Sequence, residues 1–479
     1  MKKLLTILFM IGSAALVDAQ EGYRYDKISE KSFHSAFRNV EDSVKSSAKG
    51  YHIDIYPLFN IAGGAEINDN SHEIYSANAG VEVKAGLLSK LTVSYKLYGG
   101  ISRYMNYFAN LADSLNYIPA GGGFKKKGDT YFALYHDFNL SYHITDYLKI
   151  SVGKGRKAIG DGYRSLLLGN NNSGMYFFDI NVGEGGFKYV FSLNTAKSLD
   201  SESGRGRTKY LVYHAISWNI TNYLNVGGFE AVTIVRRDSL GNSRFIDLHY
   251  LNPALFFRPV EYALGSPDNV LMGVFGKARY YKKNILYGQV MLDEYNSTFL
   301  KGGNDWWAKK FALQAGARGE LFNRLQYLVE ANYIRPFMYS HDNAISSYSM
   351  CSQPLAHPYG ANLKEGLVNL RYKTKNQKIL VDFTADIVKT GIDTDSISYG
   401  GNILLPYTLR GDDYGQTMLQ GKPLTITDLS FTMEYKMKLN FDSKSYILKP
   451  FVTLGCYNKD EKCLYFMIGI KNFDLTRFY

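Results

Sequence analysis

The sequence predicts an all-β fold, a transmembrane antiparallel β-barrel of about eighteen strands. Apolar and polar residues alternate over long segments, as in strands that face lipid on one side and a polar lumen on the other. The composition is rich in strand-forming aromatic residues and in glycine, with 40 Tyr, 28 Phe and 45 Gly in 479 residues. After the first residues, no stretch reaches the roughly eighteen consecutive apolar residues of a transmembrane helix.

The first segment of the sequence is predicted to be a secretion signal. Two lysines precede an apolar run from Leu4 to Leu16, and Val17–Ala19 offers small residues where a signal peptidase cuts. We therefore expect residues 1–19 to be a signal peptide and the mature chain to leave the cytoplasm. Residues 20–50 are polar without a sustained period, so we expect a periplasmic or plug segment there and the barrel in residues 51–479.

The alternation is clearest from Asp428 to Asp442, where apolar residues fall on one face and polar or charged residues on the other. From Phe132 to Ile144 a second apolar face is interrupted only by His136. A tilted strand crosses a bilayer in about ten residues, and several segments reach this length. Further alternating segments are Leu91–Leu97, Val212–Ile220, Leu325–Tyr333 and Ile379–Ile387.

The connections between these segments are of two kinds, tight turns and long loops. Bacterial barrels have short periplasmic turns and long external loops. If 237–268 is a single external loop, every tight turn alternates with a long loop, the strand count is even, and both termini are periplasmic. The closing strand is then 464–479, which ends on two aromatic residues. The tight turns are centred on Ser89, Thr145, Thr221, Lys283, Asn323, Asn376 and Ser443.

The segment from Phe245 to Gly273 does not follow the alternation. It holds Pro253, Pro259 and Pro267 and a dense apolar run from Ala254 to Phe257. Proline removes a donor from a strand ladder and breaks a helix, so the segment is a poor strand and a poor membrane helix. Because irregular apolar backbone must pack against something, we expect this loop to return to the lumen and to form part of a plug.

Two further loops carry more than a plain connection needs. One is Gly155–Asn172, GRKAIGDGYRSLLLGNNN, and the other is Arg335–Gly366, which contains RPFMYSH and QPLAHPYGANLKEG. On the turn count, both emerge on the same side as Phe245–Gly273, so we expect the three loops to fold into the lumen and meet there. A barrel of about 16–18 strands is wide enough for a channel unless something fills it.

The cysteines allow one disulfide. A two-residue turn at Lys459–Asp460 would place Cys456 and Cys463 opposite each other on a hairpin, and an exported chain meets an oxidising compartment. We therefore consider a Cys456–Cys463 bridge, with two buried free thiols as the alternative. Cys351 would stay unpaired.

Three blocks of the sequence resemble a known family. In chain order they are GKGRKAIGDGYRSLLL, YLNPALFFRPVEYALGSPDNVLMG and QPLAHPYGAN. They look like the Wzi-like capsule-assembly barrels of Bacteroidota, in particular proteins of the gliding-motility RemB type. The resemblance implies an outer-membrane barrel of about eighteen strands that helps to hold or organise surface polysaccharide, and a contribution to surface motility. It implies no catalytic residues.

The loops supply the candidate site. Guanidinium groups pair with carboxylates, and aromatic rings stack on sugar rings, which suits an acidic polysaccharide. The alternative is that the arginines pair with Glu261, Asp268 or Glu365 and lock the loops as a plug. The candidate ligand-binding or plug-contact residues are Arg156, Asp161, Tyr163, Arg164, Asn252, Arg258, Glu261, Asp268, Arg335, Gln353 and His357.

The sequence offers little for an enzyme. The histidines are scattered without an HExxH spacing, and no serine lies in a GxSxG motif. The glycines near Arg156 do not follow a nucleotide-binding pattern, and no calcium-loop pattern surrounds the acidic residues. We expect no catalytic activity, no metal and no cofactor.

We therefore predict an outer-membrane barrel that contributes to capsule assembly or attachment, to gliding motility, or to both. The alternative is a porin or substrate-specific channel, and a third class is an accessory barrel of a secretion complex. The net charge of +11 favours a basic lumen or anionic surface polymers. The expected partners are outer-membrane lipid, an acidic surface polysaccharide and envelope motility or secretion components, and no nucleic acid.

Overall fold

The computed structural model describes most of the predicted barrel. The described residues are 37–38, 51–87, 90–119, 121–199, 206–236, 246–252, 256–257, 259, 268–293, 303–394, 396–441, 444–459 and 462–472. Residues 1–19, which are predicted to be a signal peptide, and nearly all of residues 20–50 lie outside them, so the predicted domain boundaries stay predictions. No helix in these ranges is long and apolar enough to cross a membrane.

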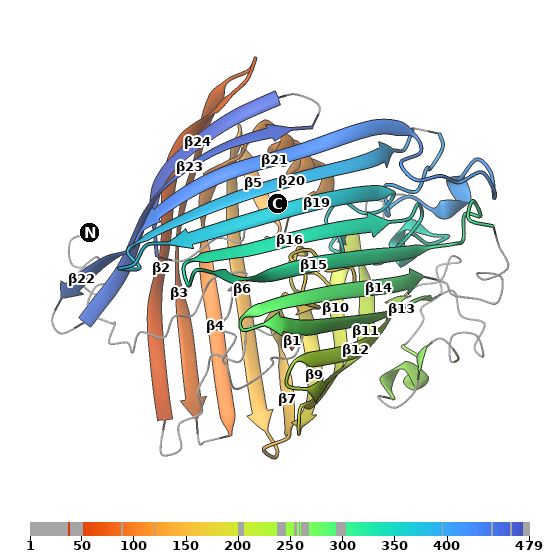
Figure 1. The fold of residues 1–479 in the computed structure, drawn as a ribbon, viewed down its shortest axis with the longest axis horizontal. Coiled ribbons are helices and arrows are strands. Elements are labelled where there is room, and N and C mark those ends of the chain that lie inside the picture. Colours follow the sequence, from red (N-terminus) through yellow and green to blue (C-terminus); the bar gives the residue numbers. More distant parts are fainter. Residues whose placement is uncertain are drawn as a thin grey trace.

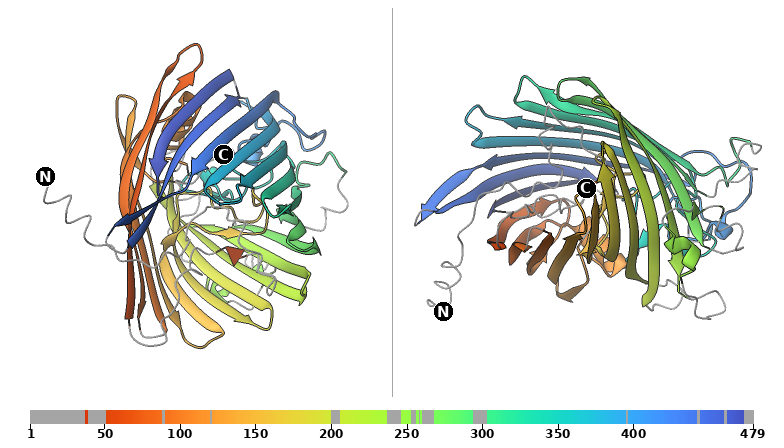
Figure 2. Two further views of the ribbon diagram at one scale, coloured as in Figure 1. Left: turned by 60° about the vertical axis from the view of Figure 1, so that its left-hand side comes forward. Right: turned by 90° about the horizontal axis from the view of Figure 1, so that it is seen from below.

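Eighteen antiparallel strands form a closed barrel (Figures 1 and 2). The strands are β2 (Tyr51–Ile67), β3 (His72–Leu87), β4 (Leu91–Arg103), β6 (Thr130–His143), β7 (Leu148–Gly155), β9 (Met175–Glu184), β10 (Phe187–Leu199), β11 (Gly206–Thr221), β12 (Leu224–Val235), β13 (Asn269–Tyr281), β14 (Asn284–Asp293), β15 (Phe311–Leu321), β16 (Leu325–Ile334), β19 (Leu363–Lys373), β20 (Ile379–Ile392), β21 (Lys422–Tyr435), β23 (Lys444–Asn458) and β24 (Lys462–Lys471).

The smaller elements lie along the wall or in the loops. β5 (Phe124–Lys127) pairs with β6, and β22 (Met437–Phe441) continues the line of β21 beside β23. In the loops lie β8 (Ala158–Ile159), β17 (Ser349–Met350), β18 (Gln353–Pro354), the helix α2 (Asn106–Leu115) and the 3-10 turns η2 (Leu248–Leu251), η3 (Ala344–Ser346) and η4 (Tyr407–Leu409). The short strand β1 (Phe37–Arg38) pairs with β8.

The structure confirms the strand count predicted from the turn lengths. β12 pairs directly with β13, so the segment between them is one connection and holds no barrel strand. The barrel closes where β2 pairs with β24, from Asn60 opposite Lys471 to Ile67 opposite Leu464. Short turns such as the one between β11 and β12 lie at one end of the barrel, which is the periplasmic end in this class of fold, and long loops lie at the other.

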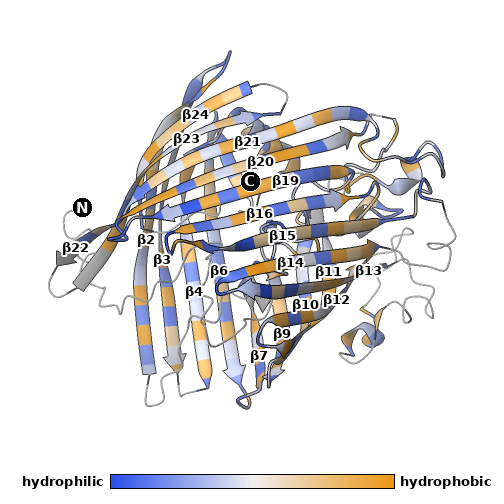
Figure 3. Ribbon diagram, viewed as in Figure 1, coloured by the Kyte–Doolittle hydropathy of each residue, from blue (hydrophilic) through white to orange (hydrophobic). Residues whose placement is uncertain are grey.

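The strands alternate between an apolar outer face and a polar inner face, as predicted. On β20, Phe383 and Ile387 are exposed on the outside, whereas Asp382, Thr384 and Asp386 are buried on the inside. Figure 3 shows this alternation of hydrophobic and hydrophilic residues along neighbouring strands. An outer face of this kind is stable only against lipid.

The largest hydrophobic cluster lies inside the barrel. It joins loop residues to inward-facing residues of the strands, so the interior around this cluster is packed like the core of a soluble protein. Leu166, Leu167 and Leu168 of the loop between β7 and β9 are fully buried in it. Loop residues Tyr339, Tyr348 and Leu355 meet strand residues such as Leu211, Leu271 and Met291 there.

The predicted position of the proline-rich loop is wrong. Its described residues, which include the fully buried Tyr250 and Phe257, pack against Phe191, Val212 and Val232. These three residues share the outward face with exposed residues such as Ile216 and Trp218, so this part of the loop lies on the outer wall of β10–β13. Figure 1 shows it outside the ring of strands. An apolar loop segment can pack on either face, and here the outer face holds its partners.

Of the two alternatives for Cys456 and Cys463, the structure shows free thiols and not the disulfide. Cys456 and Cys463 are both free, as is Cys351. The hairpin of β23 and β24 pairs Asn458 with Lys462, which places Cys456 opposite Leu464 and Cys463 opposite Tyr457. Because the register differs by one residue from the predicted turn, the two thiols point to opposite faces of the sheet.

Candidate functional site

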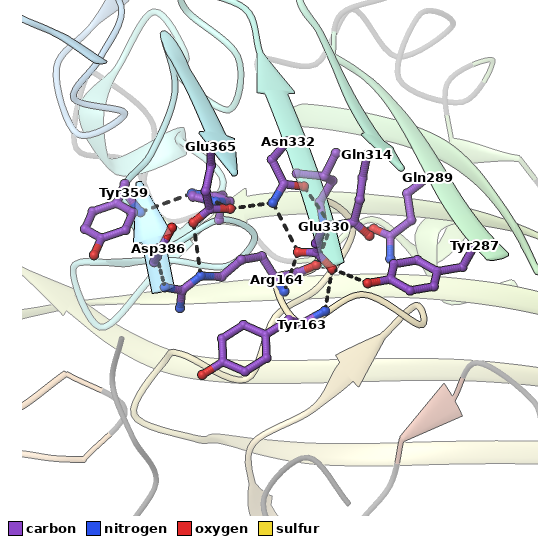
Figure 4. A network of polar contacts seen from close by, with 12 residues as sticks. Tyr163, Arg164, Tyr287, Gln289, Gln314, Glu330, Asn332, Tyr359, Glu365 and Asp386 are labelled. Atoms are coloured by element: carbon purple, nitrogen blue, oxygen red, sulfur yellow. Dashed lines mark hydrogen bonds and ion pairs between the residues drawn. The ribbon is translucent and has the colours of Figure 1, made fainter. Parts of the chain in front are cut away.

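The loop that connects β7 to β9 is held inside the barrel by a carboxylate of the opposite wall. Glu330 of β16 is buried and accepts hydrogen bonds from the backbone N–H groups of Tyr163 and Arg164, at 2.6 and 2.9 Å. The hydroxyl group of Tyr287 donates to the same carboxylate at 2.7 Å. Figure 4 shows how these groups converge. Asn332 is a fourth donor at 3.1 Å, so this carboxylate needs no further ligand.

Arg164 forms the ionic centre of this site. Its Nε lies 3.3 Å from Oε1 of Glu365, and one terminal nitrogen lies 2.9 Å from Oδ2 of Asp386 (Figure 4). Burial alone would lower the pKa of Arg164, but the carboxylates of Glu365 and Asp386 raise it well above its usual range. His357 joins the group through Nε2, 2.9 Å from Oε2 of Glu365. Two of the three guanidinium nitrogens are therefore paired with acidic residues of the barrel itself.

Asp161 makes a second ionic contact between the loop and the wall. Its Oδ1 accepts from Lys277 of β13 at 3.1 Å and from Arg318 of β15 at 2.8 Å. At the start of the loop, Lys157 pairs with Asp179 of β9 and donates to Ser192 of β10 at 2.9 Å. The loop is thus anchored along its length by buried ion pairs. Removing one partner of such a pair is costly, because the other charge is left buried and unpaired.

The loop between β16 and β19 lies against the first loop. Gly169 donates its backbone N–H to Leu355 O at 2.6 Å, and Tyr339 and Tyr348 donate their hydroxyl groups to the backbone oxygens of Leu166 and Leu167 at 2.9 and 2.8 Å. Gln353 Nε2 donates to Ser173 Oγ at 2.7 Å. Two of the three loops that the sequence predicts to meet inside the barrel therefore do so.

The remaining candidate residues lie apart from this centre. Arg335 is buried near the external end and donates to the backbone oxygens of Lys309 and Asn304. Arg156 is half-buried at the end of β7 and interacts electrostatically with Lys96 and Tyr98. Asn252 is exposed at the end of η2, and Asp268 is buried just before β13. Arg258 and Glu261 lie outside the described residues.

Among the acidic partners, Glu365 is one that the sequence already suggests for the loop arginines, whereas Glu330, Asp386 and an external aromatic cluster were not predicted. Glu330, Glu365 and Asp386 lie at inward positions of strands, and the alternation of polar and apolar residues predicts that they face the lumen. The external cluster joins two long loops. The guanidinium carbon of Arg410 lies 4.0 Å from the ring centre of Trp307, which lies 4.5 Å from the ring centre of Tyr407.

The described residues do not point to a metal-dependent site. In the parts of the chain that the structure describes, no group of three or more His, Cys, Asp or Glu side chains is arranged to hold a metal ion. The acidic residues of the lumen are instead bound to cationic side chains and N–H groups.

A closed antiparallel barrel with an apolar outer face and a polar inner face defines the class: this chain is an outer-membrane β-barrel protein. Among solved structures it is similar to Wzi of Escherichia coli, described as a carbohydrate-binding barrel involved in group 1 capsule assembly, with a TM-score of 0.53, 12% identity, 87% of this chain and 85% of that chain. It also matches two Pseudomonas aeruginosa proteins, OccK2, with a TM-score of 0.49, 7% identity, 88% of this chain and 98% of that chain, and OprD, with a TM-score of 0.47, 10% identity, 90% of this chain and 97% of that chain. No protein-family model and no curated protein sequence matches the chain.

Proposed function

We propose that this barrel is closed by its own loops and contributes to the assembly or attachment of surface polysaccharide at its outer mouth, without catalytic activity. The observation that carries the proposal is the use of Arg164. Its guanidinium group binds Glu365 and Asp386 inside the barrel, so it serves to hold a loop in place. Because breaking a buried ion pair on one side is costly, these contacts keep the loop seated in the lumen.

The outer mouth offers a surface suited to sugars. Trp307, Tyr407 and Arg410 form one stack between the loop before β15 and the loop before β21. Beside this stack the ring of Tyr414 is 62% exposed, and the carboxylate of Asp413 is largely exposed. Aromatic faces pack on sugar rings, while carboxylates accept hydrogen bonds from sugar hydroxyl groups. The carbohydrate binding described for Wzi motivates the same proposal here.

Polysaccharide binding is tested with the purified full-length protein and the surface polysaccharide of the same strain. We expect Tyr414→Ala to weaken binding by at least fivefold, because an exposed stacking ring contributes about 1 kcal/mol or more. Tyr223→Ala is the matched control, since Tyr223 has the same 62% exposure but lies in the periplasmic turn between β11 and β12. Equal binding by wild type, Tyr414→Ala and Tyr223→Ala contradicts the proposed surface.

A substrate-specific channel is the second candidate, and one observation favours it. Glu82, Lys96 and Asp137 are direct neighbours across β3, β4 and β6 and form a charged row on the inner wall. Such a row suits the passage of a charged solute. Conductance across planar bilayers separates the two functions: our proposal predicts that the wild type stays closed, and a steady, ion-selective current supports the channel.

We extend the proposal to surface motility through the sequence blocks that resemble the RemB type. A deletion strain scored for capsule retention and colony spreading together tests this extension. We expect capsule retention to fall, and spreading to change with it. A strain that spreads poorly but keeps its full capsule points to contact with motility or secretion components of the envelope instead.

A further inference from the structure

The loop between β12 and β13 covers part of the barrel's outer wall. We call its described residues, 246–252, 256–257 and 259, the outer strap. Tyr250 and Phe257 are fully buried beneath its surface, and they pack on residues that face outward from the barrel. Those residues are Phe191, Val212, Val232, Ile234 and Val270. Elsewhere on the wall, outward apolar residues such as Ile387 remain exposed.

The strap is fixed to the wall by a polar pair. His214 of β11 and Glu230 of β12 are direct neighbours on the outward face, and His214 Nε2 lies 2.9 Å from Glu230 Oε2. The backbone N–H of Phe257 donates to the same oxygen at 2.9 Å, and its ring stacks on His214 with 4.6 Å between the ring centres. The hydrogen bond from Phe257 and the stacking of its ring on His214 therefore fix the position of the strap on the wall. We call this position the seat of the strap.

This seat lies at the depth of the membrane. At about 3.3 Å per residue and a strand tilt of about 40°, Glu230 lies about 15 Å above Leu224, the periplasmic start of β12. The lipid-facing band of such barrels is about 25 Å tall. On the far wall, Ile387 is 48% exposed at about 20 Å above Ile379, the start of β20. A bilayer of uniform thickness would therefore bury the strap in hydrocarbon.

The surface of the strap does not suit hydrocarbon. Leu248 and Phe256 are 78% and 70% exposed, but Asp247 and His249 form an exposed pair beside them, with 2.6 Å between Oδ1 and Nδ1. Irregular backbone is not found facing acyl chains, because its polar groups would lose their hydrogen bonds. A mixture of exposed apolar and charged side chains is typical of segments that lie at the headgroup boundary.

We propose that the outer strap lies among the headgroups of the outer leaflet, so that the hydrocarbon layer beside β10–β13 begins below it. The exposed residues beneath the strap, Ile216 and Val274, mark the upper edge of the lipid-facing band on this side. The membrane is then locally thinner here, by roughly 5–10 Å, than beside β19–β21. The partner of this surface is lipid, and the inference does not depend on polysaccharide binding.

The test compares Phe256→Cys on the strap with Ile387→Cys on the far wall, in the full-length protein with Cys351, Cys456 and Cys463 replaced by serine. Ile387 is the matched control because it is also an exposed apolar residue and lies at a similar or greater height. The protein is reconstituted in phosphatidylcholine vesicles. We expect Phe256→Cys to react with a water-soluble maleimide at least tenfold faster than Ile387→Cys. With brominated acyl chains, we expect strong quenching only of a fluorophore at position 387.

Two results overturn the inference. Equal, slow labelling of both cysteines, with strong bromine quenching at both, shows a band of uniform height. Rapid labelling of Phe256→Cys in vesicles but protection on intact cells shows that another component of the cell surface, and not the headgroup layer, covers the strap. Leu248→Cys serves as a second strap position, so that a folding defect of one variant does not decide the outcome.

Discussion

Replacing Arg164 with alanine is the sharpest perturbation of the lumen. The change leaves Glu365 and Asp386 buried without the guanidinium group that binds both, while the wall and the outer surface stay unchanged. Removing one partner of a buried ion pair costs about 3–5 kcal/mol. At about 1.4 kcal/mol per tenfold, the equilibrium between the seated and the released loop shifts by roughly two to three and a half orders of magnitude.

Planar-bilayer conductance measures this shift directly. We expect the wild type to be closed and Arg164→Ala to show frequent openings, since the released loop clears part of the lumen. Adding Glu365→Gln and Asp386→Asn to Arg164→Ala should reduce the openings, because the unpaired buried charge is then removed. Arg164→Lys should give partial closure, since a single ammonium group spans two carboxylates less well than a guanidinium fork. If an Arg164→Ala barrel folds normally and conducts no more than wild type, Arg164 does not hold the loop in the lumen.

Three further outcomes follow from the same contacts. Glu330→Gln should weaken the seating of the loop by about 1–3 kcal/mol and raise its proteolysis rate, whereas Glu320→Gln, which removes a partly exposed pair with Lys283 at the barrel's end, should change it little. Burial raises the pKa of the Cys351 thiol to about 11, so a variant with this cysteine alone should react slowly with maleimide at pH 7 and faster as the pH rises. The reaction should be faster still in the Arg164→Ala background. Equal rates in both backgrounds would count against release of the loops. When the protein is unfolded without reductant and alkylated, mass spectrometry should find three modified thiols. A mass two units lower, with only one modified thiol, would reveal a Cys456–Cys463 disulfide, which the register of β23 and β24 does not allow.

The barrel was predictable because each strand carries its own evidence. The alternation that puts Phe383 outside and Asp386 inside can be read within a few residues, and the turn lengths give the strand count. The pairing inside the barrel was not predictable in the same way. Arg164 meets Glu365 and Asp386 from 201 and 222 residues away, and no local pattern links them.

The strap shows a second limit of the sequence. Tyr250 and Phe257 are apolar enough to pack in a lumen or on an outer wall, so composition alone does not choose between the faces. The choice depends on His214 and Glu230, two polar residues at outward positions where the alternation predicts apolar ones. An exception to the alternation was therefore the informative signal.

The polar anchors of the loop between β7 and β9 lie on one continuous stretch of wall, and this has a consequence for assembly. Asp179, Glu330 and Asp386 belong to strands from β9 to β20, and the closing seam between β2 and β24 contributes none of the described contacts of Arg164 or Asp161. An open, curved sheet can thus receive this loop before its two ends meet, so the loop does not have to thread into a finished cylinder.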